Sequence, residues 1–155
     1  MLTGIRWTRV ILAAVLSEAG VIAVLLVGIA IYSSLIAPGM SDAEYQTLGV
    51  RAGYYVAPTA GAVMTFLMVL WVGRKLESRY VANGVWVGVV SVILTLGFIF
   101  TARPEDRLMY GVAFVLRIAA GYLGGLAAQQ SAMKAWRRTR ASEAPRGQGA
   151  TTGSI

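Results

Sequence analysis

The sequence contains neither cysteine nor histidine. The absence of both excludes a disulfide framework, a thiol nucleophile and a Cys/His metal site. It also excludes a catalytic triad that depends on an imidazole base. No motif for a cofactor or a metal ion is found, and we expect none to be bound.

Charged residues are scarce. They make up 14% of the chain, whereas apolar residues make up 57%. A soluble domain usually has about a quarter charged residues, so this composition predicts a membrane protein. The net charge is +7, but the basic residues stand in short clusters beside apolar runs. That arrangement favours contact with anionic lipid headgroups over binding of nucleic acid.

The apolar residues form four long runs. These runs cover residues 10–36, 53–73, 81–102 and 108–128. Each reaches the ~20 residues that a helix needs to cross ~30 Å of hydrocarbon, and none alternates as barrel strands do. The first follows Arg6 and Arg9 as a signal peptide would, but it exceeds the usual apolar core of ~7–15 residues. We therefore predict an all-α integral membrane protein, with a four-helix transmembrane bundle within residues 1–133.

The polar segments divide these spans. Pro38-Gly39 ends the first helix, and the following "SDAE" (41–44) has the pattern of a helix-capping box. It predicts a short extracytoplasmic helix before the second span. The connections "RKLESR" (74–79) and "RPEDR" (103–107) are short. Residues 134–155 are polar and basic, and we expect a disordered cytoplasmic tail there.

The distribution of lysine and arginine predicts the orientation. Ten of these residues flank the spans on one side: Arg6, Arg9, Arg74, Lys75, Arg79, Lys134, Arg137, Arg138, Arg140 and Arg146. Three are on the other: Arg51, Arg103 and Arg107. We therefore expect both termini to be cytoplasmic, in a bacterial inner membrane. The segment "KAWRRTR" (134–140) would then contact anionic headgroups.

Small residues recur four positions apart in every span. They are Ala13 and Ser17; Gly53, Ala57 and Gly61; Gly84 and Gly88; and Gly121 and Gly125. In lipid, helices associate through close packing at such positions. We therefore expect a tight bundle or a self-associating one, as a homo-oligomer or in a larger membrane complex. Pro58 should kink the second span.

Two charged side chains lie deep in the spans, Glu18 in the first and Arg117 in the fourth. Such a residue costs at least ~2.5–3.5 kcal/mol at mid-membrane unless it finds a partner or water. With a rise of ~1.5 Å per residue, Glu18 lies ~12 Å and Arg117 ~16 Å from the cytoplasmic ends of their helices. The two residues are therefore at similar depths.

Arg117 shares one helix face with small residues, namely Ala113, Gly121, Gly124 and Ala128. That face would let another backbone approach, and we predict that Glu18 and Arg117 pair across a contact between the first and fourth helices. A carboxylate held beside a guanidinium stays ionised and is a poor proton carrier unless the pair opens. The pair is therefore either a structural element that fixes helix packing or a gated ion or substrate site.

The stretch "ILAAVLSEAG" (11–20) and the four-span layout resemble the small multidrug resistance family. The resemblance implies a short four-helix transporter in which Glu18 binds protons and cationic substrates in turn. Two features depart from that pattern. Arg117 would repel a cation near the carboxylate, and the connection at 37–52 is longer than that family's loops.

Three functions follow from these observations. The first is a non-enzymatic structural, accessory or assembly subunit of the membrane. The second is an oligomeric small transporter or channel that uses Glu18, gated by Arg117. The third, an intramembrane enzyme, is disfavoured because Glu18 is the only acid in the spans. The acids on the extracytoplasmic side, Asp42, Glu44, Glu105 and Asp106, are explained by their positions at helix starts.

Overall fold

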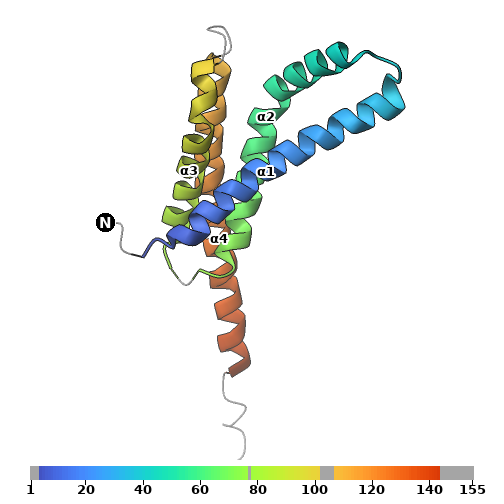
Figure 1. Ribbon diagram of the computed structural model, residues 1–155. Helices are drawn as coiled ribbons and strands as arrows, with labels where there is room; N and C mark the ends of the chain where they lie inside the picture. The colour runs from blue at the N-terminus through green and yellow to red at the C-terminus, as the bar shows by residue number, and fades with distance from the viewer. Residues whose placement is uncertain (1–3, 77, 102–106, 144–155) are drawn as a thin grey trace, which may run out of the picture.

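The computed structural model describes residues 4–76, 78–101 and 107–143. Within these residues the chain forms helices α1 (Trp7–Ile31), α2 (Asp42–Gly73), α3 (Tyr80–Thr101) and α4 (Arg107–Glu143) (Figure 1). All four are long and apolar enough to cross a membrane. For the described residues, the prediction of an all-α fold with four helices long and apolar enough to span a membrane is confirmed.

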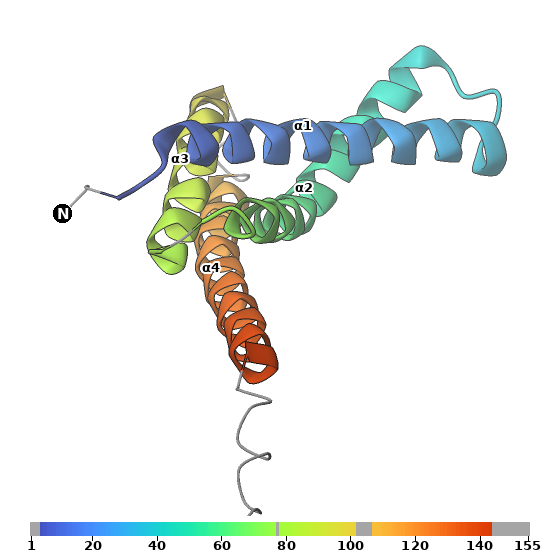
Figure 2. The ribbon, with the colours of Figure 1, turned by 90° about the horizontal axis from the view of Figure 1, so that it is seen from below.

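The first span extends beyond α1. A π-helical turn, η1 (Tyr32–Ile36), continues it, and together they form a rod of 30 residues. At ~1.5 Å per residue this rod is ~45 Å long, which exceeds the ~30 Å hydrocarbon thickness, so it is long enough to cross a bilayer with a tilt. Figure 2 shows α1 crossing the other helices as one long rod. The rod ends before Pro38-Gly39, where Gly39 has a φ of +93°.

The second span differs from the prediction. The residues assigned to a separate short helix are the first turns of α2, which runs without interruption from Asp42 to Gly73. The capping pattern is present, since the Ser41 backbone N–H donates to Glu44 Oε2 at 2.7 Å. Gly49 and Gly53 do not break the helix, because an interior glycine costs only ~1 kcal/mol relative to alanine. A break there would also leave backbone groups unpaired beside lipid.

Proline has the expected place in α2. Pro58 lies inside the helix, and α2 changes direction along its length in Figure 1. A proline removes one backbone hydrogen bond and clashes with the preceding turn, which bends a helix. The teal N-terminal part of α2 therefore runs beside α1, whereas its green C-terminal part runs beside α4.

The C-terminal helix is also longer than predicted. α4 continues to Glu143, so the assignment of residues 134–143 to a disordered tail is wrong. This segment is rich in Ala, Arg and Lys, which are good helix formers. Arg140 follows Trp136 by one helical turn, and its guanidinium carbon lies 3.9 Å from the centre of the Trp136 ring. The rest of the predicted tail, residues 144–155, lies outside the described residues.

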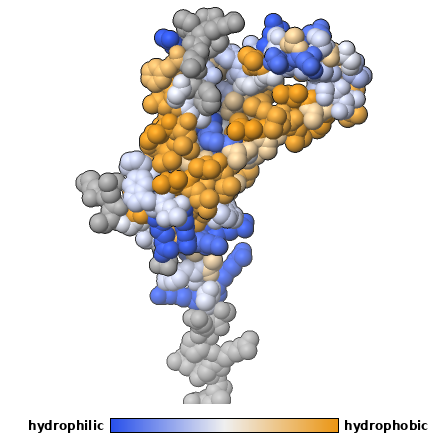
Figure 3. Space-filling view, in the orientation of Figure 1, coloured by the Kyte–Doolittle hydropathy of each residue, from blue (hydrophilic) through white to orange (hydrophobic). Residues whose placement is uncertain are grey.

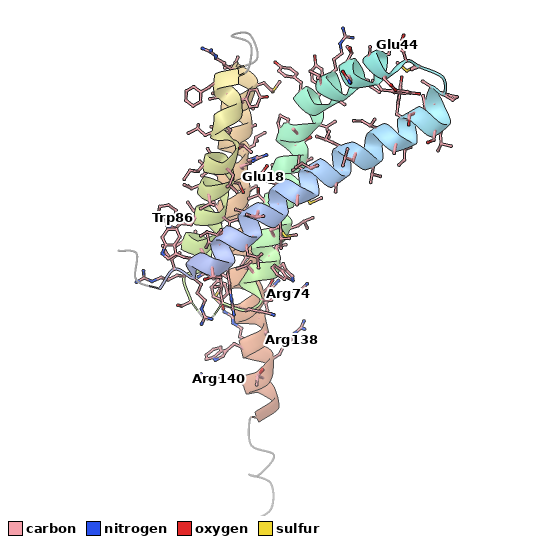
Figure 4. All side chains as sticks on the ribbon, viewed as in Figure 1. Glu18, Glu44, Arg74, Trp86, Arg138 and Arg140 are labelled. Atoms are coloured by element: carbon pink, nitrogen blue, oxygen red, sulfur yellow. The ribbon has the colours of Figure 1, made fainter. Side chains whose placement is uncertain are left out.

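The helices are packed together at one end and separate at the other. The basic end carries Arg74, Lys75, Arg137, Arg138 and Arg140, and Figure 4 labels three of these there. At the open end, marked by Glu44 in Figure 4, the arm of α1, η1 and the start of α2 diverges from α3 and α4. Both ribbon views show this divergence. The molecule is therefore V-shaped.

Glycines account for the close packing near the basic end. A Cβ on Gly84 would meet the carbonyl oxygen of Gly121 directly, and one on Gly88 would lie 2.8 Å from the Arg117 carbonyl oxygen. A Cβ on Gly125 would lie 2.7 Å from the Cα of Val81. Four of the predicted packing positions therefore lie at the α3–α4 contact: Gly84, Gly88, Gly121 and Gly125. Only residues without a side chain allow two helix backbones to approach so closely.

Glycines at the open end have no such neighbours. Gly28, Gly53, Gly97 and Gly111, one from each helix, have no described atom within 4 Å of where a Cβ would lie. The prediction that Gly53 packs a helix against another is therefore not met within this single chain. The spacing of small residues shows where another helix could approach closely, but it does not show where the helices of the bundle diverge.

Polar contacts fix the base of α1. The Ser17 and Thr65 hydroxyl oxygens, both fully buried, are 3.2 Å apart and join α1 to α2. The Arg6 backbone N–H donates to Asn83 Oδ1 at 3.0 Å, which ties the start of α1 to α3. The Trp7 and Trp86 rings pack edge to face with centroids 5.1 Å apart. The labelled Trp86 lies near the start of α1 in Figure 4.

The packing predicts opposite outcomes for two glycines of α3. Gly84→Ala places a methyl group against the Gly121 backbone, which has no flexible end to move aside. We expect it to lower the free energy of unfolding by about 1–3 kcal/mol. Gly97→Ala adds the same methyl group in open space and is the matched control. Thermal unfolding of the monomeric fraction in detergent compares them, and equal melting temperatures would contradict this packing.

Candidate functional site

Glu18 and Arg117 are placed by the middle turns of α1 and α4. In Figure 4 Glu18 lies between the basic end, marked by Arg74, and the open end, marked by Glu44. An Nη1–H of Arg117 donates to Glu18 Oε1, which forms an ion pair. The Arg117 side chain is 6% exposed and that of Glu18 is 20% exposed. The structure thus brings together the two charged residues that the depth argument paired.

The same guanidinium nitrogen also binds α3. Arg117 Nη1 lies 3.2 Å from Thr95 Oγ1 and 3.4 Å from the Ser91 carbonyl oxygen. Charge-assisted hydrogen bonds of this kind are about twice as strong as those between neutral groups. A single nitrogen of Arg117 therefore links α4 to both α1 and α3.

The other side of the guanidinium rests on α2. A Cβ on Gly61 would lie 2.7 Å from Arg117 Nε and 2.9 Å from Nη2. The glycine is thus required by the arginine, because any side chain would occupy the same space. Nε is buried and has no hydrogen-bond partner among the described residues. The sequence marked Gly61 only as a helix-packing residue, and its spacing gave no sign that an arginine lies against it.

The route of the pairing differs from the prediction. α1 packs on α2 and α3 and makes no extensive contact with α4. The small-residue face of α4 is turned elsewhere: Gly121 contacts α3, and Gly124 and Ala128 contact α2. The predicted pair is present, but it is not accompanied by extensive packing of the first helix on the fourth. The pair forms because the long arginine side chain spans the gap.

The pair lies in the wall of a cavity of about 620 Å³. All four helices line it, with Glu18, Arg117, Val15, Val21, Ile22, Gly49, Val50, Gly53, Tyr54, Ala57, Pro58, Leu94, Thr95, Met109, Tyr110, Ala113 and Phe114. We call this cavity the cleft. Figure 3 shows a hydrophilic patch between hydrophobic surfaces where the two arms of the V meet. The walls are mostly apolar, and the charged groups lie where the arms join.

The cleft combines features that the sequence did not connect. Ala57 was expected only to pack helices, yet it lines the cleft together with Thr95. Tyr54 and Tyr110 add two phenol groups. No sequence pattern marks a cavity, because its position depends on where helices diverge.

The two acids at the start of α2 lie at the open end, away from this pair. Asp42 and Glu44 belong to the first turn of α2 at the open end. Glu105 and Asp106 lie outside the described residues. Glu18 is the one carboxylate that lines the cleft, so a mechanism that needs two carboxylates has no second group in the described lining. The arrangement suits binding of a polar group at one end of an apolar molecule.

Comparison with known proteins identifies no relative: no family model, curated protein or solved structure matches the chain. The resemblance to the small multidrug resistance family therefore rests on residues 11–20 and the four-span layout alone. In this structure the carboxylate of that stretch is bound to a guanidinium.

The ion pair predicts strong coupling between its members. Replacing either Glu18 or Arg117 by Gln leaves the other charge buried without its partner, which typically costs about 3–5 kcal/mol of stability. We expect the double variant to lose at least ~1 kcal/mol less than the sum of the single losses. Unfolding in detergent, measured for the wild type and all three variants, gives this coupling energy.

A matched cycle uses Glu44→Gln with Arg117→Gln. Glu44 lies at the open end, far from the pair. The stability lost in Glu44→Gln should therefore add to that lost in Arg117→Gln within about 0.3–0.5 kcal/mol. Additive losses in the Glu18 cycle as well would show that the pair contributes no coupling.

Gly61→Ala tests the contact between α2 and the guanidinium. The added methyl group would lie within 3 Å of two guanidinium nitrogens, so Arg117 must shift and its bonds to Glu18 and Thr95 weaken. We expect a loss of about 1–3 kcal/mol and a smaller coupling energy in the Glu18–Arg117 cycle. Gly53→Ala, in the same helix but with open space around it, should change neither quantity.

Proposed function

We propose that this chain is a non-enzymatic membrane protein that acts as a structural, accessory or assembly subunit. It spans a bacterial inner membrane with the basic end and both termini on the cytoplasmic side. The excess of lysine and arginine at that end supports this orientation. The exposed basic residues at the end of α4 (Lys134, Arg137, Arg138 and Arg140) suit contact with anionic headgroups.

The observation that carries this proposal is the contrast between the two ends of the bundle. Near the basic end, the glycines of α3 and α4 are in close contact with neighbouring helices. At the open end, Gly28, Gly53, Gly97 and Gly111 have open space around them. Helix association in lipid depends on close packing at small residues. A second copy or another membrane protein that packs against the diverging arms would supply the contacts missing there.

The ion pair has a structural role in this function. Arg117 joins α4 to α1 through Glu18 and to α3 through Thr95. It does so where the arms separate, so the pair limits how far they diverge. The surface that meets a partner would then have a fixed shape.

A second candidate function is a small transporter or channel that uses the cleft. The observation in its favour is that Glu18 and Arg117 line the cavity instead of lying in a closed helix contact. Opening of the pair would give the carboxylate access to a ligand or a proton. In this function Arg117 is the gate.

Purification in mild detergent tests the assembly. We expect a particle larger than one chain with its bound detergent, either as a homo-oligomer or with another membrane protein. Gly28→Leu and Gly111→Leu add bulk where the single chain has space. They should therefore reduce the assembled fraction at least about tenfold, the effect of ~1.4 kcal/mol, without changing the melting temperature of the monomer.

Ala119→Leu is the matched control, since Ala119 is exposed on α4 and does not line the cleft. It should leave the assembly intact. Light scattering with refractive-index detection separates the protein mass from the detergent mass. A single chain without a partner over the whole range of concentrations would refute the proposal.

A further inference from the structure

We propose that the cleft binds one long-chain carboxylic acid from the membrane, with its carboxylate on Arg117 and its hydrocarbon chain against the apolar walls. The inference rests on the second candidate function, the use of the cleft as a site. It adds the class of ligand and the way in which the ion pair opens.

The first argument is the unused donor capacity of Arg117. A guanidinium has N–H donors on all three nitrogens, yet the acceptors found here, on Glu18, Thr95 and Ser91, all bind Nη1. Nε is buried and has no hydrogen-bond partner in the described part of the chain. Arg117 is 5% exposed, and a buried donor without an acceptor costs ~1–3 kcal/mol, so Glu18 leaves the guanidinium incompletely paired. Because the edge of Nε and Nη2 lies against Gly61, a ligand carboxylate would meet the guanidinium on the cleft side, at the nitrogen that binds Glu18.

The second argument is the match between a carboxylate and the pair. Arginine binds carboxylates through two parallel hydrogen bonds. Glu18 reaches the guanidinium with one oxygen, Oε1, and its side chain keeps 20% exposure. A ligand carboxylate can therefore compete with Glu18 for the same group. The two carboxylates differ only in that one belongs to the protein and the other to a free hydrocarbon chain.

The third argument is the balance of charge. A long-chain acid enters lipid as the neutral –COOH form, because a charged group is far more costly to transfer. As its carboxylate binds Arg117, its O–H bond breaks and the proton passes to a Glu18 oxygen, which forms the neutral acid. One anion replaces another, and the net charge of the site stays zero. A phospholipid phosphate would have to bring a permanent charge to this depth.

The groups around the exchange leave the proton no other acceptor of similar strength. α1 contributes Glu18, α4 contributes Arg117 and Tyr110, and α2 contributes Tyr54. α3 contributes Thr95, which does not titrate. A phenol O–H already holds its proton and has no anionic oxygen to take up another, whereas a carboxylate has one. Glu18 is therefore the proton acceptor.

The fourth argument is the shape and surface of the cleft. About 620 Å³ falls within the ~300–1,000 Å³ of sites for small molecules. Its walls include Val21, Leu94 and Phe114, and the outer surfaces of both arms are hydrophobic in Figure 3. A ligand with a hydrocarbon chain can therefore enter from the bilayer. Its chain would cover the apolar walls of the diverging arms.

A photoactivatable fatty acid with a diazirine in its chain tests the inference, with its methyl ester as the matched probe. The ester has the same chain but neither an ionisable group nor a proton to give. We expect the acid to label α1, α2 and α4 along the cleft at least about tenfold more than the ester. Peptide mapping of the labelled full-length protein in detergent locates the cross-links. Equal labelling by acid and ester overturns the proposal.

Variants distinguish labelling in the cleft from labelling of the outer surface. Arg117→Gln should reduce labelling about tenfold, the effect of ~1.4 kcal/mol, because the guanidinium that binds the carboxylate is gone. Ala57→Leu adds bulk to the cleft from α2 and leaves both charged residues in the chain, so it keeps the test valid if Arg117→Gln fails to fold. Ala119→Leu is exposed and should change nothing. Unchanged labelling in Ala57→Leu overturns the proposal.

Competition identifies the source of the ligand. An excess of unlabelled fatty acid should abolish the labelling, whereas phosphatidylglycerol should not. Displacement by phosphatidylglycerol at the same concentration would show that the cleft takes a phospholipid, which also overturns the proposal. These outcomes do not depend on the detergent mass measurements, so a failure of the inference leaves the assembly function standing or falling by itself.

Discussion

The fold depends on how a buried guanidinium is accommodated. Arg117 lies in the middle of an apolar helix and must find acceptors and space within the protein. Glu18 and Thr95 supply acceptors from two other helices, and Gly61 supplies the space on α2. Each of the four helices thus contributes to one side chain. Its requirements determine the relative positions of helices that apolar packing alone would hold loosely.

Close packing and divergence are two consequences of the same glycine-rich helices. Where Gly84 meets Gly121, the backbones of α3 and α4 approach until no side chain fits between them. Farther along α3, Gly97 has open space, since the arm of α1 and α2 has separated from α3 and α4. The bend in α2, which contains Pro58, turns its N-terminal part away with α1. Helix direction therefore decides which glycines are used within the chain.

The sequence predicts the features that depend on distance along one helix. Hydropathy and length locate four spans, and the rise per residue puts Glu18 and Arg117 at similar depths. Features that depend on neighbours are not predicted. Local polarity predicts a break after the start of α2 and disorder over residues 134–143, but both segments are continuous helix. The spacing of small residues identifies a packing face on α4, but it does not show which helix packs against that face.

The position of the ion pair connects the two proposed functions. A pair sealed inside a helix contact would contribute only to stability, and a pair open to water would exchange protons freely. Glu18 and Arg117 lie between these cases, since the arginine is buried while the glutamate keeps partial exposure in the cleft. The guanidinium Nε has no hydrogen-bond partner among the described residues. In the proposed exchange, an acceptor that enters the cleft would replace Glu18 while the bonds to Thr95 and Ser91 hold α4 on α3.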